Sequence, residues 1–250
     1  MKIAYASDLH LEFCKYQLQK PEDPETTLIL AGDITPISKL NKEMDYSWSY
    51  DSGILDFFYE ATNYFKNVIY VAGNHEFYGG ELEDIKLLKK LLSPCENLHI
   101  LNNELIELDG IKFFGGTMWT NYDNEDPLLE MNASRLMNDY RCIGDLTPQT
   151  AKWEFYKFNN KLNEIRDQNI DVVISHHAPS YQCTSPKYAD NKYNGLYCSN
   201  VDVSNIKYWI YGHLHGGLCI EQDGCQILNN TRGYPREDGF DEFELKYFEV

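Results

Sequence analysis

Six of the seven histidines in the chain lie just after short apolar runs, and only His99 lies elsewhere. Aspartate and asparagine residues follow the same runs. Together these positions are Asp8, His10, Asp33, Asn74, His75, His176, His177, His213 and His215. Imidazole, carboxylate and amide oxygen are ligands that Zn, Fe, Mn and similar ions accept, and the set lacks the thiolates of a structural zinc knuckle. The residue types therefore indicate a metal centre.

The apolar runs before these residues predict buried strands. They are rich in β-branched and aromatic residues and cover 2–7, 27–32, 68–73, 112–116, 171–175 and 207–212. Helical spacing is found at 54–65, 81–92 and 150–167, and residues 218–228 predict a hairpin around Asp223-Gly224. Strands that alternate with helices are typical of a layered α/β fold with a buried sheet. In such sheets ligands bind beyond the carboxyl ends of the strands, so the polar residues should meet at one edge.

The spacing within two of the motifs also favours convergence. In an extended chain, side chains two residues apart point to the same side, so Asp8 with His10, and His213 with His215, can each offer two ligands. Glycine precedes three of the motifs and permits tight turns there. A single histidine at a strand end is most often structural. Five motifs at the ends of five predicted strands are not explained in that way.

The ordered motifs resemble those of the calcineurin-like metallophosphoesterase superfamily. They are Asp8-Leu-His10, Gly32-Asp33, Gly73-Asn74-His75-Glu76, His176-His177 and Gly212-His213-Leu-His215, and they span residues 8–215. The resemblance implies a four-layer α/β/β/α sandwich with mixed sheets and a two-metal centre at the sheet edge. It also implies hydrolysis of a phosphomonoester or a phosphodiester.

The resemblance further implies a role for each motif residue. One divalent ion would be held by Asp8, His10 and His215, the other by Asn74, His176 and His213, and Asp33 would bridge the two. His75, which the family does not use as a ligand, would protonate the leaving oxygen or stabilise the transition state. Of the two adjacent histidines, His176 directly ends the strand and is taken as the ligand, with His177 outside the ligand set or facing the substrate. We expect two divalent ions, which would be Mn, Fe, Zn or Ni; the ligand types do not identify the metal.

Two-metal chemistry suits the hydrolysis of phosphate esters on physical grounds. Two ions about 3.5–4 Å apart can hold a bridging hydroxide at neutral pH and bind the non-attacking phosphate oxygens. Histidine is the natural acid near pH 7 because its unperturbed pKa lies close to that pH. We therefore expect a two-metal-dependent phosphoesterase, a phosphodiesterase or phosphatase, that acts by attack of the bridging hydroxide.

Composition limits the other properties of the protein. The chain has 250 residues, a hydrophobic content of 43% and a formal charge of -17, which disfavours an extended nucleic-acid groove or binding to an anionic membrane. No stretch resembles a linker, so we expect one domain over 1–250, with substrate-covering loops at 35–51 and 180–205. Seven scattered cysteines and the lack of a signal peptide or membrane span favour a cytoplasmic protein.

Several further residues are candidates for contacts with the substrate. Arg135 and Arg141, with Asn138 between them, and Arg232 after the predicted hairpin could each bind phosphate through parallel hydrogen bonds. For any one arginine, a surface salt bridge is the commoner role. Tyr193 lies in the 180–205 loop and could stack on a base or an aryl group, or be an ordinary loop residue.

We expect a small nucleotide-like substrate. The alternatives are a nuclease that acts on short or single-stranded ends and a non-catalytic scaffold that keeps the fold and binds partners. Every expected ligand position carries a suitable residue, which favours the enzyme. The oligomeric state does not follow from the sequence.

Overall fold

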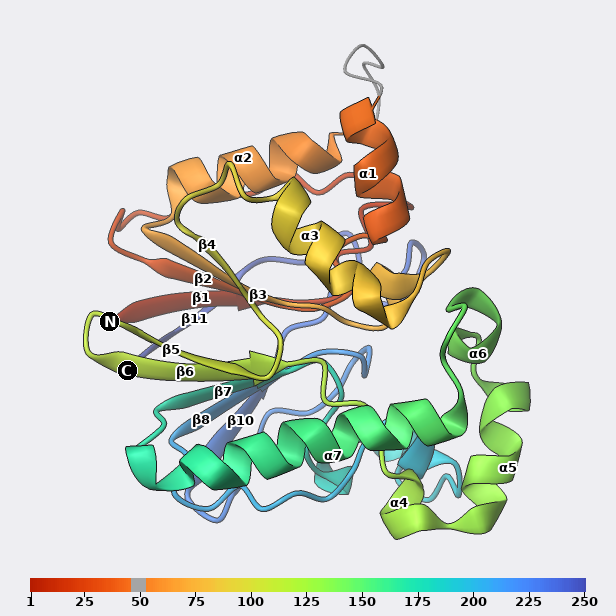
Figure 1. Cartoon of the computed structure of the whole chain (residues 1–250). Coiled ribbons are helices and arrows are strands. Elements are labelled where there is room, and N and C mark those ends of the chain that lie inside the picture. The colour runs from red at the N-terminus through yellow and green to blue at the C-terminus, as the bar shows by residue number, and fades with distance from the viewer. Residues whose placement is uncertain (46–52) are drawn as a thin grey trace.

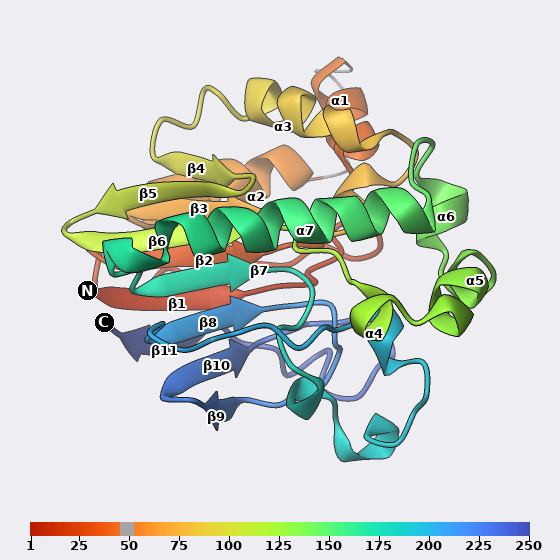
Figure 2. The same cartoon turned by 60° about the horizontal axis from the view of Figure 1, so that its bottom comes forward.

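The computed structural model describes residues 1–45 and 53–250, in which two β-sheets stack face to face between outer helices (Figure 1). Helices α1 (Ile37–Asp45), α2 (Ile54–Tyr64) and α3 (Ile85–Leu91) cover the first sheet. Helix α7 (Pro148–Ile165) lies along the outer face of the second sheet in both views (Figures 1 and 2). The predicted four-layer α/β/β/α sandwich with mixed sheets is confirmed.

The first sheet has the strand order β11-β1-β2-β3-β4. These strands are Lys246–Glu249, Lys2–Ala6, Thr27–Ala31, Asn67–Val71 and Leu98–Leu101. Strands β1 to β4 are parallel, and β11 pairs antiparallel with β1, so that the two ends of the chain lie side by side (Figure 1). The parallel strands all point their carboxyl ends to the same edge.

The second sheet has the order β5-β6-β7-β8-β10-β9. These strands are Glu104–Leu108, Ile111–Gly116, Val172–Ser175, Tyr208–Tyr211, Cys225–Asn229 and Ile220–Gln222. Strands β6, β7, β8 and β10 are parallel, while β5 and β9 pair antiparallel at the two edges. Asp223 and Gly224 connect β9 to β10 with φ angles of 51° and 81°, which confirms the predicted hairpin.

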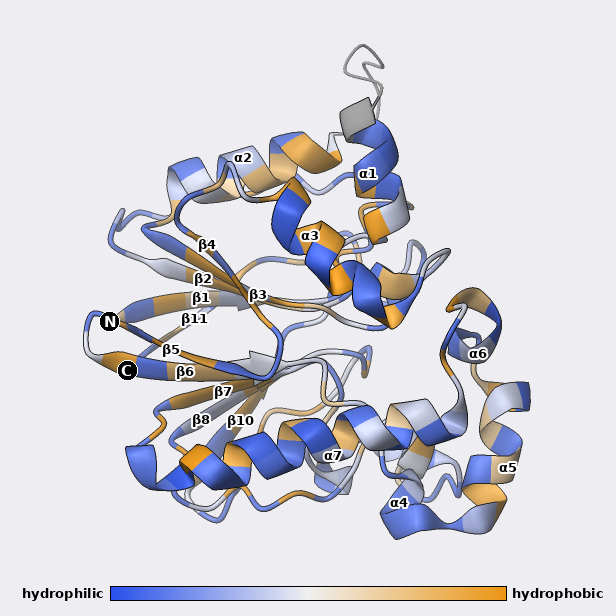
Figure 3. Cartoon of the chain, in the orientation of Figure 1, coloured by the Kyte–Doolittle hydropathy of each residue, from blue (hydrophilic) through white to orange (hydrophobic). Residues whose placement is uncertain are grey.

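The core follows from the alternation of side chains along the strands. In β1, Ile3 and Tyr5 face the second sheet, while Ala4 and Ala6 belong to the cluster that includes the helices. Helix α7 presents a stripe of buried apolar residues to its sheet, and Phe158 packs against Phe114 with ring centroids 5.0 Å apart. Figure 3 shows the matching bands of hydrophobic and hydrophilic residues along this helix.

The remaining elements are short helices, most of which lie in the connections after the parallel strands. Three short helices, α4 (Tyr122–Glu125), α5 (Pro127–Leu136) and α6 (Asp139–Cys142), connect β6 to α7. The 3-10 helices are η1 (His75–Phe77), η2 (Leu82–Asp84), η3 (Arg166–Gln168), η4 (Tyr181–Cys183), η5 (Pro186–Tyr188) and η6 (Asn194–Leu196). The last three are the only regular structure described within the predicted 180–205 loop.

The predicted loop at 35–51 is wrong in part. Residues Ile37–Asp45 form α1, whose buried Ile37 and Leu40 pack into the core, so apolar spacing within the segment supports a helix there. Residues 46–51 of that prediction lie outside the described residues. In the part of the chain that is described, no helix has both the length and the apolar character needed to cross a membrane.

Candidate metal centre

The predicted ligands meet at the edge where five parallel strands end. They follow β1, β2, β3, β7 and β8, which contribute Asp8 and His10, Asp33, Asn74, His176, and His213 and His215 in that order. His177 and His75 lie beside them. All of these side chains except those of His213 and His215 are buried, and these two are half-buried.

One group of ligand atoms is formed by Asp8, His10 and His215. Their nearest ligand atoms all lie within 4.8 Å of one another. His215 Nε2 lies 3.2 Å from Asp8 Oδ1, and the backbone N–H of His213 donates to Asp8 Oδ2 at 3.0 Å. The Asp8 carboxylate therefore faces the second histidine motif from across the sheet edge.

A second group of ligand atoms is formed by Asp33, His176 and His213, again within 4.8 Å of one another. The Asn74 amide oxygen completes this group, since Oδ1 lies 3.0 Å from His176 Nε2 and 3.1 Å from His213 Nδ1. The asparagine thus presents its carbonyl oxygen, which can bind a cation, and turns its NH2 away.

Asp33 lies between the two groups. Its Oδ2 is 3.9 Å from His10 Nε2 in the first group, and its Oδ1 is 3.4 Å from His176 Nε2 in the second. Burial by itself would raise the pKa of the Asp33 carboxyl, but the neighbouring charges of His176 and His75 hold that pKa well below its usual range. Asp33 is consequently a carboxylate with one oxygen on each side.

One imidazole nitrogen indicates that the first group is suited to a cation. His10 Nε2 is buried, lies 3.9 Å from Asp33 Oδ2, and has no hydrogen-bond partner among the described residues. A buried polar atom without a partner costs free energy, which a metal ion at that atom would remove. The ligand set of nitrogen and oxygen atoms fits divalent ions such as Mn, Fe, Zn or Ni and does not distinguish among them.

The expected extended geometry of the paired motifs is wrong. Strands β1 and β8 end at Ala6 and Tyr211, before the ligands begin. Asp8, His10 and His213 have φ angles of 52°, 46° and 64°, in the left-handed region that non-glycine residues seldom adopt. The ligands are therefore placed by tight turns after the strands, and such strained residues cluster at functional sites.

Glycine at two of the motifs makes room for the carboxylates. A Cβ at Gly212 would lie 2.6 Å from Asp8 Oδ2, and a Cβ at Gly73 would overlap the Asp33 carboxylate and its backbone nitrogen. The requirement at these positions is close approach, in addition to the freedom to turn that the sequence suggests.

His75 is set beside the two groups with both ring nitrogens engaged. Its Nδ1 lies 3.1 Å from Glu12 Oε1 and its Nε2 lies 3.1 Å from the Tyr234 hydroxyl. The ring stacks on Tyr78, with centroids 4.1 Å apart, and the backbone N–H donates to Asp33 Oδ1 at 2.8 Å. His10, Asp33 and His75 also have ligand atoms within 4.8 Å of one another, so the ring lies next to the first group.

Sequence reasoning missed the side chains that support the ligands. Asp139 accepts from Asn74 Nδ2 at 2.8 Å and from the Tyr78 hydroxyl at 2.6 Å, and burial raises its pKa. Glu237 lies 2.6 Å from His215 Nδ1. These contacts join residues far apart in the chain, so spacing could not reveal them.

Glu76 supports the site through hydrogen bonds to the backbone of the turns that carry the ligands. Its buried carboxylate accepts hydrogen bonds from the backbone N–H groups of Asp33, Ile34, Thr35 and Gly73 and from the Tyr70 hydroxyl. The glutamate lies inside the Gly73-Asn74-His75-Glu76 motif, which was a signal available in the sequence. Its role is to join the turns after β2 and β3, and burial raises its pKa.

The adjacent histidines His176 and His177 have different surroundings. His176 Nδ1 lies 2.9 Å from the carbonyl oxygen of Ala31, which leaves Nε2 for Asn74 and Asp33. The His177 ring packs against the His213 ring, with centroids 4.2 Å apart. Burial and the nearby charge of His176 lower the pKa of His177 to about 3.

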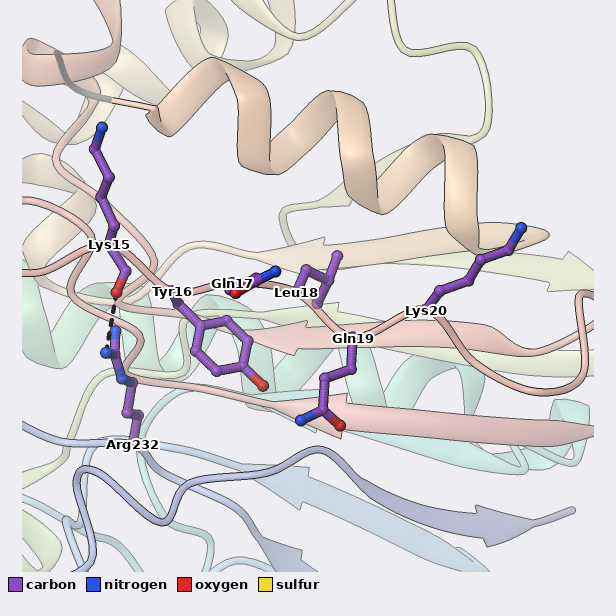
Figure 4. Close-up of a pocket in the computed structure, with 7 residues that line it drawn as sticks. All are labelled: Lys15, Tyr16, Gln17, Leu18, Gln19, Lys20 and Arg232. Atoms are coloured by element: carbon purple, nitrogen blue, oxygen red, sulfur yellow. Dashed lines mark hydrogen bonds between the residues drawn. The ribbon is translucent and has the colours of Figure 1, made fainter.

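Arg232 is nine-tenths buried, and its guanidinium holds the segment that follows the first motif. It donates to the carbonyl oxygens of Leu9, Cys14 and Lys15 at 3.1–3.2 Å. The same side chain lines a cavity of about 700 Å³ together with residues 15–20 (Figure 4). The guanidinium is therefore hydrogen-bonded to backbone carbonyl oxygens of this chain.

The other predicted substrate contacts lie on the helices and the loop around the edge. Arg135, Asn138 and Arg141 are exposed, and Arg141 Nη2 donates to Asn138 Oδ1 at 2.6 Å. Tyr193 is half-buried against the core, with Lys192 Nζ 4.9 Å from its ring centroid. None of these four side chains is in the ligand groups found among the described residues.

Fold and site together define a metallophosphoesterase. The chain belongs to the calcineurin-like phosphoesterase family, whose sequence model matches residues 1–217. The uncharacterized protein L509 of Acanthamoeba polyphaga mimivirus is 26% identical over 272 residues, covering 94% of this chain and 92% of that protein. The crystal structure of a phosphopantetheinyl hydrolase from Mycobacterium tuberculosis superposes with a TM-score of 0.70 at 17% identity, covering 94% of this chain and 90% of that one. The second likeness shows the shared fold.

Proposed function

We propose that the protein is a two-metal-dependent phosphoesterase that hydrolyses a phosphodiester or phosphomonoester, with a small nucleotide-like molecule as its substrate. The observation that carries this proposal is the position of Asp33 between two groups of histidine and carboxylate ligands. Asp8, His10 and His215 would hold one ion, and Asn74, His176 and His213 the other.

When bound, such an ion pair lowers the pKa of a water molecule and offsets the negative charge of the phosphate. The chain supplies the remaining chemistry. His75 Nδ1 contacts Glu12, and His75 Nε2 contacts the hydroxyl of Tyr234, which is an exposed residue. We assign to this nitrogen the proton that passes to the leaving oxygen as the bond from phosphorus to that oxygen breaks.

Aromatic rings beside the ligand groups support a substrate with a planar part. Phe13 is 58% exposed, and its ring lies 5.8 Å from that of Tyr234 and 6.5 Å from that of His75. On the other side, Tyr197 lies 5.7 Å from the His213 ring. Aromatic rings of this kind stack on bases and aryl groups.

The compartment proposed for the protein is the cytoplasm. All seven cysteines are free in the structure, which is the usual state of thiols in a reducing compartment. The charge of -17 supports a small substrate over an extended nucleic acid, because long anionic chains would be repelled.

A substrate screen tests the proposal. The protein is loaded with Mn, Fe, Zn or Ni and assayed on aryl phosphate, bis-aryl phosphate, cyclic nucleotides, short oligonucleotides and 4′-phosphopantetheine esters. The last are included because of the hydrolase with the same fold. We expect turnover of the small diesters that Asp33→Ala abolishes.

Each other result has a defined meaning. Preferred cleavage of oligonucleotides would identify a nuclease that acts on short or single-stranded ends. Dominant activity on monoesters would exclude a nucleotide diester as the substrate. If no substrate is turned over while two ions are bound, the protein is better explained as a non-catalytic scaffold than as an enzyme.

A further inference from the structure

Glu12 is a buried carboxylate that contacts two functional histidines at once. Its side chain is 6% exposed, and its Oε1 lies 3.2 Å from His10 Nδ1 and 3.1 Å from His75 Nδ1. The two rings meet edge to face, with centroids 4.5 Å apart. One carboxylate oxygen is therefore shared between a proposed metal ligand and the proposed proton donor.

This contact determines which nitrogen of each ring is free. A carboxylate accepts hydrogen bonds, so both rings must carry a hydrogen on Nδ1. The Nε2 atom of His10 then has its lone pair free, and this buried atom has no partner among the described residues. The Nε2 atom of His75 faces the Tyr234 hydroxyl at 3.1 Å.

We infer that Glu12 is a positioning residue that fixes both rings, and so couples the first metal group to proton delivery by His75. The part of the inference that concerns proton delivery by His75 rests on the proposed function. Before transfer His75 carries a hydrogen on both ring nitrogens. After the Nε2 proton has moved to the leaving oxygen, the other hydrogen remains bonded to Nδ1 and is still donated to Glu12 Oε1. The Glu12 carboxylate itself gains no proton in this step.

The tautomers of the histidine rings can be measured without an activity assay. In wild-type protein, long-range 1H–15N NMR at a pH where His75 is neutral should show the Nδ1–H tautomer. Glu12→Ala should give the Nε2–H form or a mixture. In titrations with Zn or Mn, Glu12→Ala should weaken the affinity for one ion by about 10–100-fold, the usual effect of losing a partner of a metal-binding histidine. Glu12→Gln keeps an acceptor oxygen and should recover part of both losses.

The catalytic half is tested with two esters that differ in their leaving group. At saturating metal, Glu12→Ala should lower kcat on a phenyl ester by about 10–100-fold more than on the matching 4-nitrophenyl ester, because nitrophenolate leaves without a proton. The double variant Glu12→Ala with His75→Ala should be no slower on the phenyl ester than His75→Ala alone.

Glu237→Ala is the matched control. Glu237 lies 2.6 Å from His215 Nδ1, as Glu12 does to His10, but it does not contact His75. Its replacement should weaken metal binding and, at saturating metal, slow both esters equally.

Three results would overturn the inference: an unchanged His75 tautomer in Glu12→Ala, unchanged metal affinity, or equal loss on both esters. If wild-type protein hydrolyses neither ester nor any substrate of the screen with two ions bound, the proposed function fails. The tautomer and the metal titrations still decide whether Glu12 positions the rings.

Discussion

At the scale of single residues, the site is organised by carboxylates that each serve more than one partner. Asp33 faces both ligand groups, Glu12 contacts two histidines, and Asp139 accepts from both Asn74 and Tyr78. Sharing of this kind holds several side chains in one arrangement. Loss of one carboxylate should therefore disturb more than one contact.

His75→Ala should keep both metal ions and lower kcat by about 10²–10⁴-fold, since proton transfer by a positioned side chain is worth that much. The check is kcat and metal content measured on the same sample. His99→Ala is the control, because His99 lies in β4, outside the ligand groups found among the described residues, and should stay near wild type. Unchanged turnover in His75→Ala would remove the proposed proton donor.

Asp139→Ala should weaken the affinity for one ion by about 10–100-fold. The Asn74 amide would lose the acceptor that turns its NH2 group away, so its Oδ1 would no longer be fixed toward His176. Isothermal titration with Mn or Zn measures the effect. Tyr78→Phe keeps the carboxylate and should show the smaller loss, whereas equal weakening of both ions in Asp139→Ala would contradict this role.

At the scale of elements, the parallel strands bring the motifs to one edge and the turns after them aim the ligands. The strands that precede the motifs could be predicted because their apolar runs are buried on both faces, and the hairpin because Asp223-Gly224 marks its turn. Strands β4, β5 and β11 could not, since each lies at a sheet edge and has exposed or half-buried positions. The left-handed turns at Asp8 and His213 were also not predicted, because Asp and His adopt a positive φ more often than most residues but still only in a minority of cases.

Gly73→Ala tests the close approach in the turn after β3. The added Cβ would overlap the Asp33 carboxylate, so we expect loss of metal binding and destabilisation by about 1–3 kcal/mol. Gly144→Ala is the control, because its Cβ would make an ordinary 3.5 Å contact with the Gly80 carbonyl oxygen. Chemical denaturation and metal titration of both variants provide the comparison, and a Gly73→Ala protein that binds metal normally would refute the steric argument.

At the scale of the whole molecule, residues from Asp8 to Glu237 meet at one edge between the two sheets. The ordered motifs were enough to predict the family and the fold, and the residues predicted as ligands lie close together at the sheet edge. The motifs were not enough to predict Glu12, Asp139, Tyr234 or Glu237 as partners, because those contacts depend on which loops meet after folding.

Metal binding should stabilise the fold as a whole. Asp8 and Asp33 are buried carboxylates that follow different strands, and each ion bound only by the folded chain adds about 2.7 kcal/mol when its free concentration is 100 times its Kd. For a chain of this length that corresponds to a rise in Tm of about 5–10 °C. Calorimetry with and without EDTA measures it. Asp33→Ala should respond much less, and a Tm of wild-type protein that ignores both metal and chelator would contradict this prediction.

The number of ions per chain tests the two-metal site most directly. Metal analysis of wild-type protein, His213→Ala and His215→Ala, each equilibrated with Mn or Zn and freed of excess ion, should give two ions in the first and one in each variant. His213 faces Asn74 and His215 faces Asp8, so each replacement should remove a different ion. A single ion in wild-type protein, or two ions retained in both variants, would contradict a centre built from two ligand groups that share Asp33.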